Sequence, residues 1–237
     1  MLEKDVSSLS RGLYIIEYIA YNQPVGFNQI KEHTAINNSS LNRLLKTLIS
    51  NGYICKDAVG KYALSLKPFT IAYSNFRVQP LFGYSHNILL ELSNKYSVSV
   101  AFVSFSISGY CFLDKVECPD NVALRSIGDF SEILHDTPWG FLKLYLMPEN
   151  ERYEYMKKVS PTLAEKIYQS FDFISSNGYA DESWYTPNRR KLAIPIYDNN
   201  KNMIAAIAIG SHVDWLDDKK CDSILKDLTQ MLRKYYL

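Results

Sequence analysis

The chain has 237 residues, which is long enough for two modest domains or one large one with an ample core. Its longest apolar run, Met203–Ile209, is far too short to span a bilayer, and the charged N-terminus, Met1–Asp5, lacks the apolar core of a signal peptide. These features argue against a membrane-spanning or secreted protein and predict a soluble, cytoplasmic one with no membrane partner.

The charge distribution and the cysteines indicate which partners and cofactors to expect. The net charge of +1 hides an asymmetry: residues 1–77 hold nine Lys and Arg against five Asp and Glu, or +4, and the remainder carries −3. A mildly basic N-terminal part favours local binding of an anionic polymer, although small surface biases of this kind are common. The cysteines form no C-x-x-C pair and have no His at metal-ligand spacing, which predicts reduced thiols and no metal or cofactor. They are Cys55, Cys111, Cys118 and Cys221.

The first predicted helix begins behind Ser7 and Ser8, which can cap it, and ends near Asn22–Pro24. Its apolar residues recur at helical spacing and are expected to form its apolar face. They are Leu9, Leu13, Ile16, Ile19 and Ala20. A second, shorter helix is predicted from Phe27 to Thr34, and the tight junction Thr34–Ile36 leads out of it.

The stretch Asn37–Gly52 predicts a third helix, with cap candidates before it and a stop signal at its end. One face carries apolar residues at the spacing of a buried side: Leu41, Leu44, Leu45, Leu48 and Ile49. The opposite face is polar and cationic: Ser39, Arg43, Lys46, Thr47 and Ser50. Such groups can reach base edges and phosphates in a major groove, but taken alone the pattern fits an ordinary solvated helix better.

A predicted hairpin after this helix favours the DNA-binding interpretation over an ordinary solvated helix. Strands at Tyr53–Lys56 and Lys61–Leu64 flank the four-residue loop Asp57–Gly60. The order helix, helix, turn, helix and hairpin is that of a winged helix-turn-helix. The wing tip would offer Lys61, and with it Lys56, to a phosphate backbone.

Several segments of this region carry a family resemblance. Ser8–Leu13, Ala35–Leu45 and Gly52–Ile54 resemble the DNA-binding domain of IclR-type bacterial transcriptional regulators. The resemblance implies that Ser39, Ser40 and Arg43 lie on the motif, whereas Asn38 and Asn42 replace the usual basic or His residues and point to a different base sequence. The predicted DNA-binding residues are Arg11, Asn38, Ser39, Ser40, Asn42, Arg43, Lys46, Thr47 and Lys61.

After the wing, Ser65–Pro68 leads into a predicted linker helix, since proline is favoured in a first helical turn. Phe69, Ala72, Tyr73 and Phe76 fall on one side of it. In the family that the chain resembles, this helix joins the DNA-binding and sensor domains and packs in the dimer. Docking of the aromatic stripe on its own domain is equally consistent with the pattern, and both interpretations stay open here.

The remaining residues predict an α+β domain with an antiparallel sheet, because helix, strands, helices, strands and helix follow one another. Helices are expected after Pro80 as far as Tyr96 and at Trp139–Leu146, Glu149–Val159, Thr162–Ser175 and Asp217–Tyr235. Strands are expected at Ser97–Phe105, Tyr110–Val116, Ala123–Ile127, Lys191–Tyr197 and Met203–Ser211.

The same order resembles the GAF-like effector-binding domain of IclR-type regulators. The recognisable segments are His135-x-Thr137-x-x-Gly140, Gly178–Glu182, Arg190–Ile196 and Ile207–Gly210. The resemblance implies that they line a pocket for a small effector, often a carboxylate or an aromatic acid, and helix N-terminal amides near Thr137–Gly140 could hold an anion. The predicted effector-binding residues are His135, Thr137, Trp139, Gly140, Asp181, Glu182, Lys191, Ala193 and Ile209.

This chain also departs from the family pattern. Asp136, Pro138 and Phe141 replace the usual Ala, Ala and Lys, and Trp139 stands where a small or aliphatic residue is usual. Trp139 and Phe141 could therefore partly fill the pocket. Lys191 replaces a frequent Cys. If its side chain points inward, it could pair with an anionic ligand; if it points outward, it would form a solvated edge with its Arg neighbours. The run of charges favours the solvated edge.

Nothing in the sequence marks a nucleophile, a phosphate loop or a metal cluster, so we expect no enzyme. The interpretation is a transcription regulator with a DNA-binding domain at 1–66, a linker helix at 67–79 and an effector-binding and oligomerisation domain at 80–237. It would bind palindromic double-stranded DNA as a homodimer or a dimer of dimers. The alternatives are a regulator whose C-terminal domain only oligomerises and, less favoured, a small-molecule enzyme.

Overall fold

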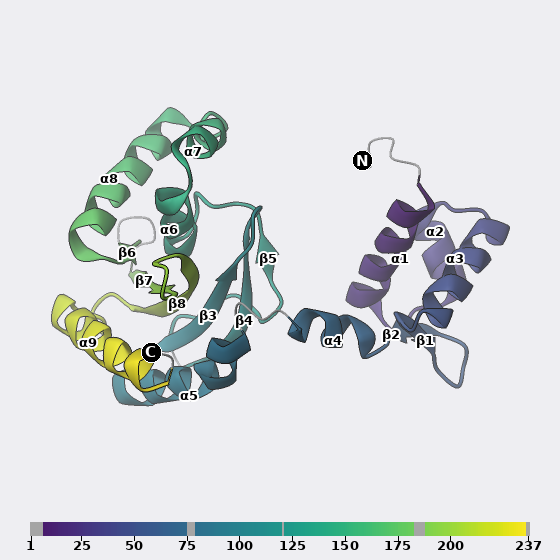
Figure 1. Cartoon of the computed structure of the whole chain (residues 1–237), viewed down its shortest axis with the longest axis horizontal. Coiled ribbons are helices and arrows are strands. Elements are labelled where there is room, and N and C mark those ends of the chain that lie inside the picture. Colours follow the sequence, from purple (N-terminus) through teal and green to yellow (C-terminus); the bar gives the residue numbers. More distant parts are fainter. Residues whose placement is uncertain (1–6, 75–78, 120, 183–187, 236–237) are drawn as a thin grey trace. The chain divides into compact units, whose positions relative to one another are not determined.

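The computed structural model describes residues 7–74, 79–119, 121–182 and 188–235, in two compact units that span residues 1–75 and 76–237 (Figure 1). The predicted contribution of Phe76 to the linker helix lies outside the described residues. Each unit is built around its own hydrophobic core.

The first unit is a three-helix domain with a two-stranded wing. Its elements are α1 (Ser8–Asn22), α2 (Phe27–Thr34), α3 (Asn38–Ser50), β1 (Ile54–Lys56), β2 (Tyr62–Leu64) and α4 (Lys67–Tyr73). Ser7 caps α1 and Asn37 caps α3, each by accepting a hydrogen bond from a backbone N–H three residues on. Ala35 adopts the left-handed conformation at the end of α2, which makes the tight junction to α3. The predicted winged helix-turn-helix is confirmed.

The apolar face predicted for α1 is wrong in part. The residues that α1 buries are Gly12, Ile15 and Ile19, whereas the side chains of Leu9 and Leu13 are 71% and 52% exposed. The helix carries apolar residues on two sides, and the packing of α2 and α3 selects the side that includes Gly12. The sequence alone could not distinguish an inner apolar face from an outer one.

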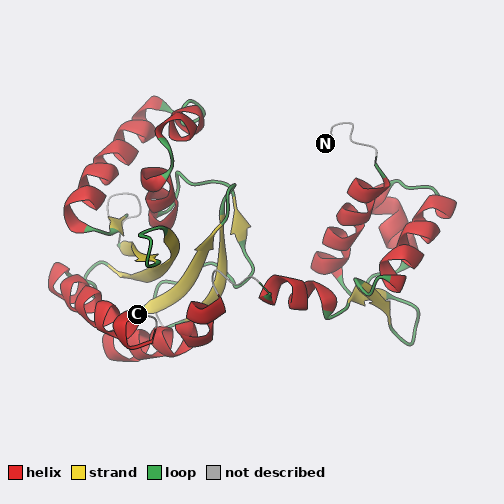
Figure 2. Cartoon of the chain, viewed as in Figure 1, coloured by secondary structure: helices red, strands yellow, loops and turns green. Residues whose placement is uncertain are grey.

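The second unit is an α+β domain, as predicted. Its helices are α5 (Gln79–Tyr96), α6 (Pro138–Leu146), α7 (Glu149–Met156), α8 (Pro161–Asn177) and α9 (Asp218–Tyr235), and its strands are β3 (Ser99–Phe105), β4 (Tyr110–Val116), β5 (Phe130–Ser131), β6 (Ala180–Asp181), β7 (Arg189–Tyr197) and β8 (Met203–His212). The strands form one antiparallel sheet in the order β5-β4-β3-β8-β7-β6. Helices α5 and α9 cover one face, and α6 and α8 cover the other (Figures 1 and 2).

Two details of the sheet differ from the prediction. Residues 123–127 form no strand; the chain first pairs with β4 further on, where Gly128 N donates to Phe112 O and Phe112 N donates to Asp129 O. The edge strand is therefore β5, whose Ser131 is the register partner of Tyr110. The two-residue strand β6 at the opposite edge is too short for a sequence pattern to reveal.

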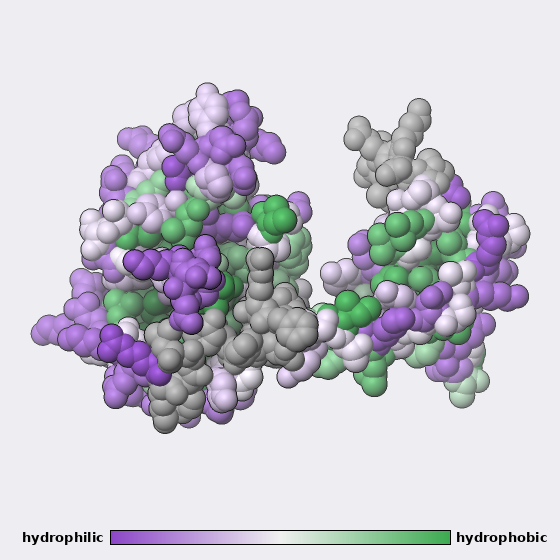
Figure 3. Space-filling model, viewed as in Figure 1, coloured by the Kyte–Doolittle hydropathy of each residue, from purple (hydrophilic) through white to green (hydrophobic). Residues whose placement is uncertain are grey.

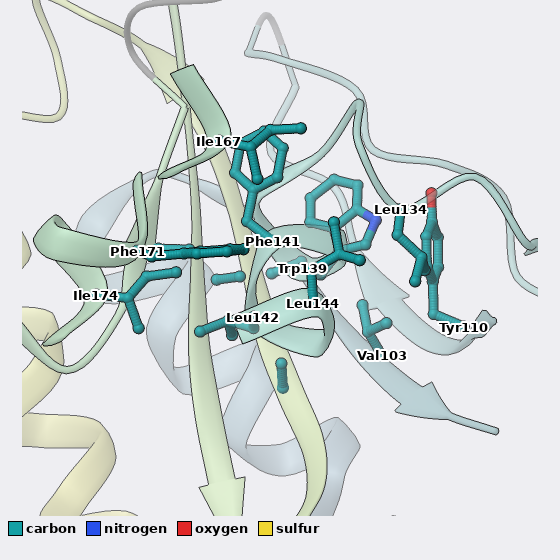
Figure 4. Packing of buried hydrophobic residues seen from close by; sticks show 14 of the residues in the cluster. Val103, Tyr110, Leu134, Trp139, Phe141, Leu142, Leu144, Ile167, Phe171 and Ile174 are labelled. Carbon is teal, nitrogen blue, oxygen red and sulfur yellow. The ribbon is translucent and has the colours of Figure 1, made fainter. Parts of the chain in front are cut away.

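The two faces of the sheet have different chemistry. The strand residues facing α6 and α8 include a set of alanines, against which bulky side chains of the two helices pack (Figure 4). These alanines are Ala101, Ala180, Ala193, Ala206 and Ala208. On the α5 and α9 face the strands supply branched residues instead, such as Leu192, Ile207 and Ile209. The alternation follows from the two-residue period of a strand.

Gly140, in the first turn of α6, packs closely against the backbone of the preceding segment. Its backbone lies so close to residue 134 that an added Cβ would come within 2.2 Å of the Leu134 carbonyl oxygen. Only a residue without a side chain fits at this point, since backbone atoms cannot move aside cheaply.

We expect Gly140→Ala to lower the free energy of unfolding of the second unit by about 1–3 kcal/mol, because it forces the backbones apart. Tryptophan fluorescence in urea measures this unit alone, since Trp139, Trp184 and Trp215 all belong to it. The control is Gly83→Ala in α5, where an added Cβ would meet nothing within 4 Å. Gly83→Ala should be neutral or stabilise slightly, and an equal loss in both variants would contradict this account.

Candidate DNA-reading surface and effector site

The outer face of α3 is open to solvent within its own unit. Its exposed polar residues are Asn38, Ser39, Asn42, Arg43, Lys46, Thr47 and Ser50, while Ser40 is half-buried. Leu41 and Leu45 point into the core at 0% and 1% exposure, and Leu44 and Leu48 pack against it. Six of the outer residues line a shallow depression along the helix, namely Ser39, Asn42, Arg43, Lys46, Thr47 and Ser50.

The charges on this face are available to a partner. Among the described residues, no ion pair involves Arg43 or Lys46. The Thr47 hydroxyl donates to the Arg43 carbonyl, and the Ser39 hydroxyl donates to Asn37 Oδ1, so both retain only acceptor capacity in this conformation. The face can thus offer cationic donors and hydroxyl acceptors to an anionic surface with polar edges.

The other residues of the predicted DNA-binding set flank α3. Lys61 is exposed at the end of the wing turn, where its backbone N–H donates to Asp57 Oδ1. Lys56, across the hairpin, lies over the Tyr62 ring with Nζ 4.8 Å from the centroid. Arg11 is half-buried near the start of α1.

The predicted effector-binding residues divide between the two faces of the sheet. Ala193 belongs to the core beneath α6, together with Trp139, while Ile209 belongs to the core beneath α5 and α9. The prediction that Ile209 shares a pocket with Ala193 is therefore wrong. Its neighbour Ala208 faces the α6 side instead, and the period of two could have identified it from the sequence.

Asp181 is held in place by a buried arginine. Arg190 Nε and Nη2 donate to Asp181 Oδ2 at 3.0 and 2.7 Å, Nη1 donates to the Leu216 carbonyl, and Nη2 also reaches Asp218 at 2.8 Å. Burial opposes the guanidinium charge, but the hydrogen bonds and charge of Asp181 outweigh it, and the pKa of Arg190 is raised. The Asp181 carboxylate thus joins β6 to Arg190 of β7, and Arg190 in turn contacts Asp218 at the start of α9. The carboxylate does not face the α6 side, which corrects its assignment as an effector contact.

Glu182 and Lys191 form a second pair. Lys191 Nζ lies 3.4 Å from Glu182 Oε1; the Glu182 side chain is 1% exposed and that of Lys191 is 22% exposed. The expectation of a solvated edge therefore holds only for Arg189, which is exposed, whereas Arg190 is buried and Lys191 half-buried. Lys191, one of the predicted effector-binding residues, places a positive charge on β7 beneath α6.

The start of α6 offers little room to an anion. Thr137 caps the helix through Oγ1, which accepts from Gly140 N, and Phe141 N donates to the Thr137 carbonyl. Pro138 has no N–H, so this turn leaves at most the Trp139 amide to a ligand. The expected anion cradle at Thr137–Gly140 is therefore largely closed.

Trp139 and His135 have neighbours that the sequence did not indicate. The Trp139 ring is 1% exposed and lies edge-on to Tyr110 and Phe112, with centroids 6.1 and 5.2 Å away. His135 Nδ1 lies 2.9 Å from Tyr155 Oη, which also accepts from Leu134 N. Burial raises the pKa of Tyr155. Tyr110 and Tyr155 come from β4 and α7, so no local pattern could have linked them to the His135 segment.

Comparison with known proteins identifies the family. Residues 75–235 match the family model "Bacterial transcriptional regulator IclR C-terminal", and residues 8–58 match "IclR helix-turn-helix domain". The chain belongs to the IclR family of bacterial transcriptional regulators. The IclR relatives described below are named as regulators, not as enzymes.

Among curated IclR relatives, the "Transcriptional repressor IclR" of Escherichia coli strain K12 is 25% identical over 232 residues, covering 91% of this chain and 83% of its own length. The "Acetate operon repressor" of Salmonella typhimurium is 23% identical over 228 residues, with the same two coverages.

Solved IclR structures share the fold. An IclR homologue from Microbacterium hydrocarbonoxydans, complexed with 4-hydroxybenzoate, superposes with a TM-score of 0.79 at 16% identity over 94% of this chain and 95% of that one. The Thermotoga maritima IclR gives a TM-score of 0.69 at 19% identity over 94% of each chain. Among the described residues, no single helix is both long enough and apolar enough to cross a membrane.

We expect Arg190→Ala to cost about 3–5 kcal/mol of the second unit's free energy of unfolding, because it removes the cationic partner of the buried Asp181 carboxylate. Urea unfolding followed by tryptophan fluorescence measures the loss. Arg189→Ala, one residue away and exposed, should stay within about 0.5 kcal/mol of the parent. Similar values for the two variants would show that the buried pair contributes nothing particular.

Proposed function

We propose that this IclR-family regulator reads a specific DNA sequence through the outer face of α3 and responds to a small-molecule effector bound in its second unit. The observation that carries the proposal is the exposed row of polar and cationic residues on α3, set on a helix whose leucines are buried. The proposed domains are residues 1–66 for DNA binding, 67–79 as linker and 80–237 for effector binding and oligomerisation, in a protein that acts on DNA in the cytoplasm.

The proposed DNA contacts fall into two groups, those to base edges and those to phosphates. Ser39, Ser40, Asn42 and Arg43 are proposed to touch base edges, with Asn38 and Thr47 beside them at the rim. Arg43 is suited to a bidentate contact with guanine O6 and N7. Lys46, Lys61 and Arg11 are proposed to touch phosphates, which fix the position of the domain on the duplex but carry no sequence information.

We further propose a homodimer, or a dimer of dimers, on a palindromic site, since one winged domain makes too few contacts for operator-level affinity. The exposed apolar residues of the first unit support a second copy as partner. Leu9 and Leu13 on α1 and Phe69, Ile71 and Tyr73 on α4 are each 48% exposed or more. Figure 3 displays apolar surface over both helices.

The proposed effector is a small carboxylate or aromatic acid, and the 4-hydroxybenzoate in the Microbacterium homologue supports this class. Lys191 would meet its negative charge, near Glu182, Ala193 and the start of α6. Binding would alter the linker and hence the spacing of the two reading helices in the dimer.

A second candidate function keeps DNA reading but assigns oligomerisation alone to the second unit. The burial of Trp139 and Phe141 favours it, because these rings occupy core space beneath the small residues of the sheet. Calorimetry against a panel of small carboxylates separates the two. Saturable binding supports the effector proposal, and no heat from any member supports oligomerisation only.

Arg43→Ala should weaken binding to the preferred duplex by about 1–3 kcal/mol and relax sequence preference, because it removes a base-reading donor. The duplex is first enriched from a random pool with the unmodified chain, and affinity is then measured by fluorescence anisotropy. Arg233→Ala on α9, which is also exposed, is the control and should bind like the parent. Unchanged affinity of the Arg43 variant would refute this placement of α3.

Leu13→Glu should reduce self-association at least tenfold, since it sets a charge in the proposed apolar contact between copies. Analytical ultracentrifugation measures the change, and circular dichroism checks that the helices remain. Lys31→Glu, an exposed position on α2, serves as the matched control. A Leu13 variant that associates as strongly as the parent would exclude α1 from the interface.

A further inference from the structure

On β4 and at the start of α6, three buried side-chain polar atoms have no hydrogen-bond partner among the described residues. They are Tyr110 Oη, Trp139 Nε1 and Asp136 Oδ1. Tyr110 is 0% exposed and Trp139 is 1% exposed. Burying such groups unpaired costs free energy, so each one in a folded protein requires an explanation, often a ligand or a bound water.

The three residues belong to one cluster. The rings of Tyr110 and Trp139 lie edge to face, 6.1 Å apart. Arg125 links Asp136 to them, because its Nη2 lies 3.3 Å from Asp136 Oδ2 and its Cζ lies 5.9 Å from the Tyr110 ring centroid. Figure 4 displays the Trp139 nitrogen and the Tyr110 oxygen on the same side of the apolar cluster, beside Leu134.

The chemistry of these atoms defines what would satisfy them. Trp139 Nε1–H can only donate, a carboxylate oxygen such as Asp136 Oδ1 can only accept, and the Tyr110 hydroxyl can do either. An oxygen that accepts from Trp139 and Tyr110 and donates to Asp136 would satisfy all three. A hydroxyl group has this capacity, whereas a carboxylate oxygen has no proton to give and would meet the negative charge of Asp136.

We propose that Tyr110, Trp139 and Asp136 form a subsite that recognises the hydroxyl group of a small effector. The inference rests on the proposed effector response and deepens it: the effector is a hydroxylated molecule whose hydroxyl lies at this cluster. Any carboxylate that it carries points away from Asp136. A site that hydrogen-bonds a hydroxyl discriminates strongly against the analogue without it, because the protein groups are then left unpaired.

The test uses two matched pairs of probes and the full chain. The pairs are glycolate with acetate, in which a hydrogen replaces the hydroxyl, and phenol with toluene, in which a methyl group replaces it. Calorimetry and thermal unfolding should detect binding of the hydroxylated member of at least one pair, with its partner at least tenfold weaker. Tyr110→Phe and Trp139→Phe should each weaken that binding at least tenfold, and Asp136→Asn should also weaken it.

The matched control is Tyr153→Phe, which removes a hydroxyl from an exposed tyrosine on α7 outside the cluster and should bind like the parent. Without probe, Tyr110→Phe should unfold at or above the parent's temperature, because it removes an unpaired buried group. A lower unfolding temperature of Tyr110→Phe without probe would point to a permanently bound water and overturn the proposal. So would equal binding of both members of each pair, or no binding of any probe.

Duplex binding in the same samples separates this inference from the proposed function. A chain that binds its enriched duplex but no hydroxylated probe refutes the hydroxyl subsite alone. A chain that binds no duplex refutes the regulator proposal, and the calorimetry then still decides whether the cluster recognises a hydroxyl.

Discussion

The burial of Leu41 and Leu45 against Ile15, Ile19 and Ile30 is the contact on which the proposed DNA reader depends. An isolated helix of 13 residues, the length of α3, is marginal in water, so its formation requires packing. Each fully buried leucine contributes about 2–3 kcal/mol, several times the usual differences in helix propensity. Packing therefore fixes the rotation of α3, and with it the direction in which Arg43 and Lys46 point.

In the second unit, the two-residue period of the strands plays the corresponding role. It places Arg190 with Asp181 on the side of α9, and Lys191 with Glu182 on the side of α6. Adjacent charged residues thus have separate tasks: one pair joins the sheet to a helix, and the other brings charge to the proposed effector site. The alanines beneath α6 leave space that Trp139 and Phe141 occupy, which makes these two rings the main determinants of any remaining pocket.

The sequence predicted the elements of the first unit closely because their signals are local: caps at Ser7 and Asn37, leucine spacing in α3 and the turn before Lys61. It predicted the α+β class of the second unit for the same reason. It could not choose between two apolar sides of α1, since that choice depends on α2 and α3. Nor could it find the cluster of Tyr110, Asp136 and Trp139, which joins residues from β4 and from the start of α6 only after the sheet has formed.

The most direct test of the central claim is to capture fragments of the source genome with the full chain, at moderate salt, and to sequence them. The account predicts enrichment of a few fragments that share an inverted repeat, with half-sites separated by a whole number of helical turns. Recovery of fragments no different from the input, at low salt as well, would contradict the claim that α3 reads DNA.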